Sequence, residues 1–516
     1  MNLAHLLLRS ARVFPEAPAL YLGERLLWNY AELASRVRNL AHCLKERLGV
    51  APGDRVALIM SNVPEYLEIL HATWMAGGMA VPINAKLHPK EAAFILQSSA
   101  PRVLFVSADL AARAAPFVSA VAELRHTFVA GDAEYRALCD GPALTAPVPR
   151  ESQDVAWLFY TSGTTGHPKG VMQTHQNLLA MTMSYFTDVD TARSQDAYIC
   201  AAPLSHGAGL YQLPQALVGA RHVMPESAGF DPEELTRLAN HHGSACLFAA
   251  PTMVQRLVDH LSKSGSAAEG FRTVVYGGGP MYVEDLQRAR EVMGDRFAQI
   301  YGQGESPMTI TALSRHHLGD RTHLRHAHRI ASVGVAQTPV EVRLADSFGQ
   351  PCAPDEMGEV LVRGGTVMRG YWNNPRASAD ALRDGWLWTG DLGSMDRDGF
   401  LTLRDRSKDL IISGGSNVYP REVEEVLLKH PAVQEVAVVG RRSQQWGEEV
   451  TAFVVSRSGE PLSAWQCSAE HGHAKGRMGR VSSGRVLFRR QRAPDPDPPG
   501  YLRCLRCPPR VGLPRA

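Results

Sequence analysis

Short apolar runs alternate with stretches of helical period along most of the chain. Residues 55–60 form a nearly unbroken apolar run that predicts a buried strand, and residues 65–75 predict the helix that follows it. Residues 30–48 have the period of an amphipathic helix. Further strand-like runs are found at residues 102–106, 155–160, 246–250, 273–276 and 297–300. This alternation predicts parallel sheets covered by helices.

The pattern changes in the last third of the chain. Residues 341–344 and 358–363 are short strand-like segments separated by turns, which indicates a small β-barrel. Residues 421–430 then predict a helix, and residues 435–439 and 450–455 predict strands. We therefore predict an α/β protein with a large N-terminal domain of two parallel-type sheets, helices and a small β-barrel. A truncated α+β domain follows it.

Three regions follow from these changes: residues 1–404, a partial C-terminal domain at 405–465, and a tail at 466–516. After Trp465 the apolar periodicity is lost, and Arg, Gly and Pro become frequent. The tail is strongly basic, whereas the remainder of the chain is acidic. Such a composition is typical of disorder, and in a GC-rich gene it is also typical of a shifted reading frame.

Composition excludes several classes of protein. The 516 residues include only 8 cysteines, which are scattered, so a disulfide scaffold is excluded and a reducing, cytoplasmic compartment is expected. Cys504 and Cys507 form a C-x-x-C pair without a second pair in zinc-ligand spacing. The long uncharged run at 69–85 contains His, Gly, Pro and Asn, so no membrane span is predicted.

The loop that follows the strand at 155–160 carries the most informative chemistry. It reads Thr-Ser-Gly-Thr-Thr-Gly-His-Pro-Lys from Thr161 to Lys169. Glycines let the backbone turn and direct N–H groups at an anion, while hydroxyls and a lysine add further donors. The loop therefore suits a polyphosphate. It is not a Walker A motif, because Gly170 follows the lysine where Ser or Thr would be required.

This loop resembles the phosphate-binding signature of the adenylate-forming superfamily, which includes acyl-CoA synthetases, firefly luciferase and peptide-synthetase adenylation domains. The resemblance extends from near the N-terminus to about Trp465. It implies ATP, Mg²⁺ and coenzyme A as cofactors, with Thr161 and Lys169 as catalytic residues. It also implies a set of residues that hold the nucleotide, namely Ser162, Gly163, Thr164, Thr165 (also a metal ligand) and Gly166.

A second motif, Tyr-Gly-Gln-Gly-Glu, ends at Glu305 and follows the strand-like run at 297–300. A carboxylate at a strand end can hold Mg²⁺ against phosphate oxygens. By resemblance Glu305 is the catalytic metal ligand, and Tyr301 and Gly302 lie beside adenine. The superfamily usually has Thr where this chain has Gly304.

The resemblance assigns further nucleotide and CoA residues. Asp391, in Trp-Thr-Gly-Asp, would bind the ribose hydroxyls, because an acceptor-only carboxylate suits a diol. Arg406 would also contact ribose, and Lys408 would lie at the interdomain hinge. Two glycine-containing loops complete the set, one under adenine and one along the pantetheine tunnel: Gly278, Gly279 and Pro280, and Gly414 and Gly415.

The segment from Pro203 to Gln212 resembles the lining of the acyl pocket and would contribute His206, Gly207 and Leu210. It contains no acidic residue that could pair with an amino group. A carboxylic acid without an α-amino group is therefore expected. Medium-chain, long-chain and aromatic acids all remain open.

The superfamily places a catalytic lysine in an Asn-x-x-Gly-Lys context near its C-terminus. The nearest match here is Ser-Ser-Gly-Arg, with Arg485 in place of the lysine. Two explanations remain open: a frame shift near Trp465, or a true substitution, which would not be conservative because arginine presents a planar fork. Either explanation predicts weak formation of the acyl adenylate.

Two functional hypotheses follow. The chain is either an acid–thiol ligase that converts a carboxylic acid, ATP and CoA to acyl-CoA, or an impaired relative that binds ATP or acyl ligand without turnover. The basic tail lacks interleaved aromatic residues, so no nucleic-acid partner is expected. A homodimer is compatible with the sequence.

Overall fold

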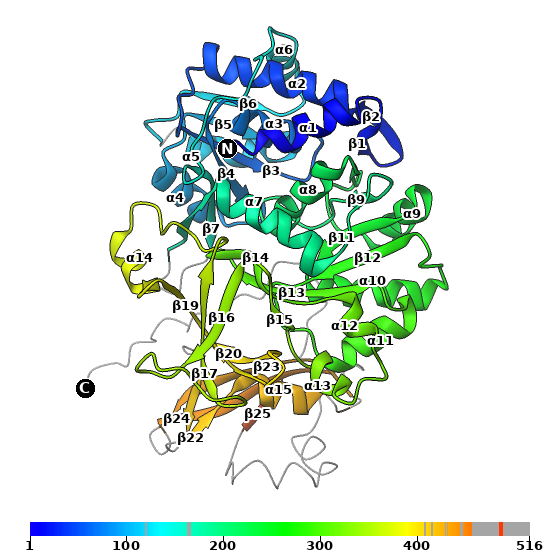
Figure 1. The fold of residues 1–516 in the computed structure, drawn as a ribbon, viewed down its shortest axis with the longest axis vertical. Coiled ribbons are helices and arrows are strands. Elements are labelled where there is room, and N and C mark those ends of the chain that lie inside the picture. The colour runs from blue at the N-terminus through cyan, green and yellow to red at the C-terminus, as the bar shows by residue number, and fades with distance from the viewer. Residues whose placement is uncertain are drawn as a thin grey trace, which may run out of the picture. The chain divides into compact units, whose positions relative to one another are not determined.

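The computed structural model describes residues 1–118, 121–161, 167–406, 409–413, 416–428, 430, 432–443, 447–456 and 485–488. The chain divides into two compact units, Met1–Leu410 and Ile411–Ala516. The sequence had placed this division at residues 404 and 405. Figure 1 shows the secondary-structure elements of both units.

The described part of the large unit contains a nine-stranded sheet of order β15-β14-β13-β12-β11-β9-β10-β1-β2. Its central strands run parallel, whereas β2, β14 and β15 add antiparallel pairs at the two edges. The strands are β1 (Pro18–Leu22), β2 (Arg25–Asn29), β9 (Ala197–Ile199), β10 (Arg221–Met224), β11 (Ala245–Ala249), β12 (Phe271–Tyr276), β13 (Phe297–Gln303), β14 (Ser306–Leu313) and β15 (Val335–Ala336).

A second sheet in the same unit has six described strands, in the order β6-β5-β3-β4-β7-β8. All neighbours are parallel except β7 and β8, which form an antiparallel hairpin. The strands are β3 (Arg55–Met60), β4 (Met79–Asn84), β5 (Val103–Val106), β6 (His126–Val129), β7 (Val155–Thr161) and β8 (Lys169–Thr174). Their apolar runs are buried because helices cover the sheet.

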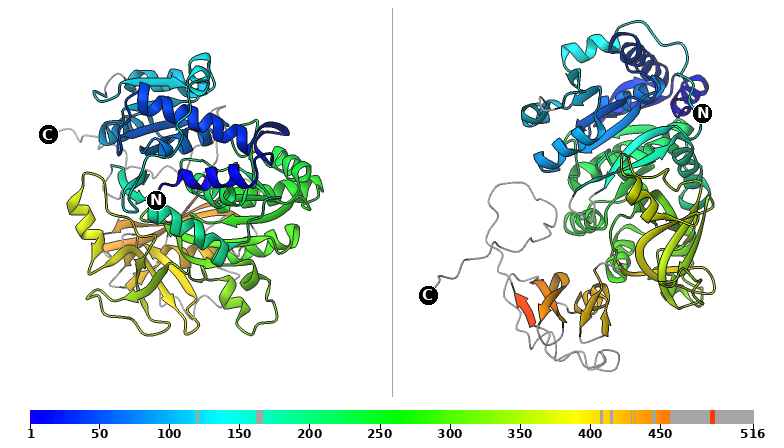
Figure 2. Two further views of the ribbon diagram at one scale, coloured as in Figure 1. Left: turned by 45° about the horizontal axis from the view of Figure 1, so that its top comes forward. Right: turned by 90° about the vertical axis from the view of Figure 1, so that its left-hand side faces the viewer.

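Helices pack over these two sheets, and α1, α2 and α3 lie side by side (Figures 1 and 2). The helices of the large unit are α1 (Ala4–Val13), α2 (Tyr30–His42), α3 (Glu65–Met75), α4 (Pro89–Ser99), α5 (Ala111–Val118), α6 (Ala133–Cys139), α7 (His175–Ser184), α8 (Gly207–Val218), α9 (Pro232–His242), α10 (Pro251–Ser264), α11 (Val283–Met293), α12 (Arg315–Gly319), α13 (His326–Ile330) and α14 (Pro375–Ala381). Short π-helical segments, Cys43–Arg47 and Tyr185–Val189, extend α2 and α7, and Ala108–Leu110 is a 3₁₀ turn. No helix in the described ranges is long and apolar enough to cross a bilayer.

The predicted small β-barrel region forms a five-stranded antiparallel sheet, in the order β16-β17-β19-β18 with β20 paired to β19. Its strands are β16 (Val340–Ala345), β17 (Met357–Gly364), β18 (Leu382–Arg383), β19 (Trp386–Met395) and β20 (Leu401–Arg406). The predicted α/β class with two parallel-type sheets is confirmed, and the predicted small β-barrel occurs as this antiparallel sheet.

The small unit is an α+β fold built on a long β23–β24 hairpin, drawn in yellow to orange in Figure 2. Apolar residues of α15, among them Val423 and Leu427, pack against a core that includes Val438 and Val454. Its elements are β21 (Ile411–Ser413), β22 (Ser416–Val418), α15 (Pro420–Leu428), β23 (Val433–Ser443), β24 (Gly447–Ser456) and β25 (Arg485–Phe488). β25 pairs parallel with β24, although it lies in the segment for which the sequence predicted no regular structure.

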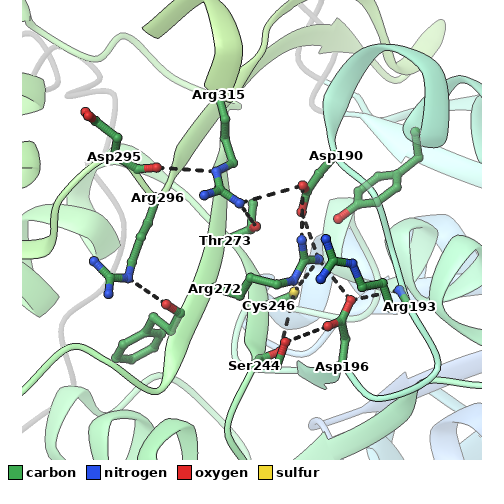
Figure 3. Close-up of polar contacts among 12 residues, drawn as sticks. Asp190, Arg193, Asp196, Ser244, Cys246, Arg272, Thr273, Asp295, Arg296 and Arg315 are labelled. Atoms are coloured by element: carbon green, nitrogen blue, oxygen red, sulfur yellow. Dashed lines mark hydrogen bonds and ion pairs between the residues drawn. The ribbon is translucent and has the colours of Figure 1, made fainter. Parts of the chain in front are cut away.

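A buried ion network lies at the amino ends of β9, β11 and β12 in the nine-stranded sheet (Figure 3). The guanidinium of Arg272 lies 2.9 Å from Asp190 and 3.0 Å from Asp196. The Ser244 hydroxyl donates to Asp196 at 2.6 Å, and the backbone N–H of Arg193 donates to the same carboxylate at 2.8 Å. These charges pair with each other at the amino ends of the strands, which leaves the carboxyl ends of the strands for ligands.

Candidate active site

The predicted catalytic residues Thr161 and Lys169 lie directly opposite each other. Thr161 ends β7 and Lys169 begins β8, and the two residues pair in the antiparallel register of the hairpin. The hairpin therefore brings the lysine back to the carboxyl end of β7. The loop between them lies outside the described residues, so five predictions there stay predictions: Ser162, Gly163, Thr164, Thr165 and Gly166.

The turn between β13 and β14 lies against this hairpin. A Cβ atom on Gly304 would lie 2.5 Å from Cγ2 of Thr161 and 3.0 Å from Cδ1 of Phe159. The Gly304 carbonyl also accepts a hydrogen bond from the side-chain amide of Gln173 on β8, at 2.6 Å. Glycine at this position therefore permits a contact that threonine could make only if Thr161 moved.

Glu305 is hydrogen-bonded to a residue that the sequence did not suggest. The Tyr371 hydroxyl donates to Oε1 of Glu305 at 2.6 Å, and the Lys169 ammonium lies 5.0 Å from the centroid of the same ring. Tyr371 follows β17 in a loop with no recognisable motif, and only the folded chain brings it to Glu305. Burial, and next the adjacent Glu305, raise the pKa of Tyr371, so its hydroxyl remains a donor.

The surroundings of Glu305 fit Mg²⁺. Its Oε1 is held by Tyr371, while Oε2 has no hydrogen-bond partner within the described ranges. No group of three or more His, Cys, Asp or Glu side chains that could hold a metal occurs in the described part of the chain. Mg²⁺ commonly binds through one or two carboxylates together with substrate phosphates, so a single carboxylate beside a phosphate loop is compatible with it.

Asp391 is fixed by two donors from β13. The Tyr301 hydroxyl and the Gln303 side-chain amide each donate to Oδ2 of Asp391, both at 2.6 Å. Gln303 lies inside the predicted motif, yet a neutral amide gave no signal of its role. Asp391 also pairs with Arg406 in the β19–β20 backbone register, although the side chain of Arg406 is not described.

The predicted glycine loop follows β12 and packs beside β13. A Cβ on Gly277 would lie 2.5 Å from the carbonyl oxygen of Ile300, so the loop can approach the strand only without a side chain there. Gly278 has a φ of +80°, and a Cβ on it would meet nothing within 4 Å, so its surface is open. Gly279 and Pro280 complete this turn before α11. Gly302 lies on the neighbouring strand.

The predicted acyl-pocket residues lie at the start of α8, among apolar and aromatic side chains. The ring of His206 meets Phe159 edge to face at a centroid distance of 5.3 Å. Burial lowers the pKa of His206 to about 4, so the imidazole is neutral near pH 7. A Cβ on Gly207 would lie 2.9 Å from both Met308 and Phe248. Leu210 is buried one turn further along α8.

Some predictions fall outside the described residues. Lys408, predicted at the hinge, and Gly414 and Gly415, predicted along the CoA path, are among them. The large unit also has a separate cavity of about 470 Å³, which none of the predicted residues lines. Arg36 and Glu68 form an ion pair in its wall at 2.8 Å, and the Tyr135 hydroxyl donates to the same glutamate.

Two family models match the chain. The AMP-binding enzyme family matches residues 7–372, and the AMP-binding enzyme C-terminal domain matches residues 422–482. The second match continues past Trp465, where the sequence pattern changes.

Similar proteins include several CoA ligases. A feruloyl-CoA synthase of Amycolatopsis sp is 38% identical over 464 residues, which cover 89% of this chain and 90% of that protein. A medium/long-chain fatty-acid–CoA ligase of Mycobacterium tuberculosis is 34% identical, with 88% and 80% covered.

Solved structures with a similar fold match nearly the whole length of the chain. ATP-bound MatB from Rhodopseudomonas palustris is 27% identical with a TM-score of 0.83, and 96% of each chain is covered. The o-succinylbenzoate CoA synthetase of Bacillus subtilis, in complex with its acyl-adenylate intermediate, is 30% identical with a TM-score of 0.80, and 94% of each chain is covered. From its sequence and its fold, this chain belongs to the AMP-binding enzyme family of the adenylate-forming superfamily, and its relatives include acyl-CoA ligases.

Proposed function

We propose that this chain activates a carboxylic acid with ATP and transfers the acyl group to coenzyme A. A carboxylate oxygen attacks the α-phosphorus of ATP, pyrophosphate leaves, and an acyl adenylate forms. The CoA sulfur then attacks the acyl carbonyl carbon, and AMP leaves. The observation that carries the proposal is the gathering of Lys169, Glu305 and Asp391 around the ends of β7 and β13 in a chain of this family.

Each of these residues has a role that follows from its charge and position. Both reactants are anions, so the site must neutralise charge and hold the reacting atoms in line. Lys169 would do so at the phosphates, and Asp391, already fixed by Tyr301 and Gln303, would accept hydrogen bonds from the ribose hydroxyls. Mg²⁺ held by Glu305 would stabilise the charge that develops on the phosphate oxygens.

The acid that we propose has an apolar or aromatic body and no α-amino group. His206 is neutral and lies against Phe159, and Gly207 lies against Met308 and Phe248. The segment from Pro203 to Gln212 offers no carboxylate to an ammonium group. Relatives that act on ferulate and on medium- or long-chain fatty acids support the same class. ATP and CoA are both available in the cytoplasm, which is the compartment that we propose.

Exchange of radiolabelled pyrophosphate into ATP tests the first half-reaction. The panel should contain ferulate, a medium-chain and a long-chain fatty acid, 2-succinylbenzoate and an amino acid, and acyl-CoA should be measured by mass spectrometry. We expect acid-dependent exchange that Glu305→Gln abolishes and that Glu341→Gln, at an exposed ion pair with Arg363, leaves unchanged. Exchange with the amino acid alone would contradict the proposed acid class.

A second candidate is a chain that binds ATP but adenylates poorly. It is favoured by the nearest match in this chain to the motif of the superfamily's catalytic lysine, which has Arg485 in place of the lysine. Nucleotide binding with no detectable exchange for any acid would support it. Resequencing across the Trp465 codon distinguishes a frame shift from a true substitution, because a restored frame ending in a Gly-Lys motif would show that the substitution is not real.

A further inference from the structure

Tyr371 lies between the two charged residues of the proposed nucleotide site. Its hydroxyl donates to Oε1 of Glu305 at 2.6 Å, and its ring faces the Lys169 ammonium at 5.0 Å. One side chain therefore contacts both the expected metal ligand and the expected phosphate ligand. Nothing in the sequence motifs assigns it a role.

Backbone hydrogen bonds join the segment around Tyr371 to β8, next to Lys169, and to Glu305. Tyr371 forms an isolated antiparallel bridge with Val171, and the N–H of Trp372 donates to the carbonyl of Gly170 at 2.7 Å. These contacts join it to β8, directly after Lys169. On the other side, the N–H of Met368 donates to the carbonyl of Glu305 at 2.8 Å.

Burial fixes the side chain as well as the backbone. Tyr371 is 8% exposed and packs in a core cluster with Val171 and Tyr301, and its own N–H donates to the Ser378 hydroxyl at 2.8 Å. A tyrosine held in this way has little freedom to turn. Its hydroxyl therefore stays directed at the Glu305 carboxylate before any nucleotide arrives.

We infer that Tyr371 is a positioning residue for the metal ligand Glu305, an inference that rests on the proposed function. Its hydroxyl holds Oε1, so that Oε2 is presented to the metal without a search among side-chain rotamers. Hydrogen bonds that orient a ligating carboxylate matter: their loss typically lowers metal affinity about 10- to 100-fold. The role is exerted through Glu305, and Tyr371 itself does not touch the reacting atoms.

Tyr371→Phe isolates this role, because it removes the hydroxyl and keeps the ring beneath Lys169. Tyr135→Phe is a matched control. The Tyr135 hydroxyl donates to Glu68 at 2.7 Å, so this variant also breaks a buried tyrosine–glutamate hydrogen bond, but away from the site. Circular dichroism melting of both variants verifies that each is folded.

The experiment measures equilibrium binding of a fluorescent ATP analogue (mant-ATP) while Mg²⁺ is titrated. We expect Tyr371→Phe to raise the Mg²⁺ concentration for half-maximal tightening about tenfold. Affinity without Mg²⁺ should be unchanged, and Tyr135→Phe should behave as the unaltered chain. Glu305→Gln should remove the Mg²⁺ response, and adding Tyr371→Phe to it should have no further effect.

Three results would overturn the inference. An unchanged Mg²⁺ dependence in folded Tyr371→Phe would show that the hydroxyl does not position Glu305. An equal loss of affinity with and without Mg²⁺ would show a merely structural role. Absence of nucleotide binding by the unaltered chain would refute the proposed function and this role with it.

Discussion

Replacing Arg272 by methionine tests whether residues at the amino ends of the strands in the nine-stranded sheet contribute to stability, while those at the carboxyl ends bind ligands. The side chains of Arg272, Asp190 and Asp196 are 12%, 7% and 0% exposed in their ion pairs. Arg272→Met keeps much of the packing volume and leaves two buried carboxylates without their cation. Breaking a buried pair in this way costs about 3–5 kcal/mol of the free energy of unfolding.

We expect a value near the lower end of that range. The Ser244 hydroxyl and the backbone N–H of Arg193 continue to donate to Asp196 after the substitution, so this carboxylate keeps part of its stabilisation. Among the described residues, Asp190 keeps one other cation, Arg315, at 4.0 Å. The predicted loss is about 3 kcal/mol at pH 7.5.

Urea unfolding followed by tryptophan fluorescence at pH 7.5 measures this free energy of unfolding. Arg288→Met is the control, because the Arg288–Asp259 pair is 46% and 45% exposed and should contribute less than about 1 kcal/mol. Folded Arg272→Met should bind mant-ATP as tightly as the unaltered chain. A destabilisation below that of the control, or a loss of nucleotide affinity in folded protein, would refute this division between stability at the amino ends of the strands and ligand binding at their carboxyl ends.

Other variants test the site itself. Asp391→Asn should weaken mant-ATP binding about tenfold or more, because it removes a charged acceptor; an unchanged dissociation constant would exclude a ribose contact. Gly207→Val should raise the KM for aromatic acids about tenfold through overpacking against Met308 and Phe248, with ATP affinity unchanged; an equal rise for ATP would indicate a general defect. A further variant, outside the candidate site, concerns the buried His71. Burial lowers the pKa of His71 to about 4, so at this position only the unfolded chain takes up a proton as the pH falls from 7 to 5. His71 should therefore contribute about 2 kcal/mol to the fall in the free energy of unfolding between pH 7 and pH 5, and His71→Gln should remove this contribution in urea titrations at the two pH values.

Local periodicity was sufficient to predict the elements whose pattern is short and regular. The strand at 55–60 and the helix at 65–75 occur as β3 and α3 at those residues. The helix expected at 30–48 ends at His42 and continues as a π-helical segment, which a 3.6-residue period does not distinguish from further α-helix. Strand order, such as the pairing of β1 with β10, depends on contacts distant in sequence, and no local pattern encodes it.

The same distinction between local patterns and contacts distant in sequence applies to the candidate site. Glu305 and Asp391 can be predicted as candidate residues from the sequence because their motifs are local. Tyr371 and Gln303 cannot be predicted in this way, because each is hydrogen-bonded to a candidate residue that is distant in the chain and neither carries a charge. The low pKa of His206 likewise follows from burial, which only the packed structure reveals.

In the proposed reaction, a carboxylate oxygen of the acid attacks the α-phosphorus of ATP. Transfer of ¹⁸O from the acid to AMP reports this attack. The unaltered chain is incubated with ATP, Mg²⁺, CoA and an acid labelled with ¹⁸O in its carboxyl group, and the AMP is examined by mass spectrometry. We expect each AMP formed to carry one ¹⁸O atom from the acid, whereas unlabelled AMP, or label recovered in pyrophosphate or orthophosphate, would contradict attack by the carboxylate oxygen on the α-phosphorus.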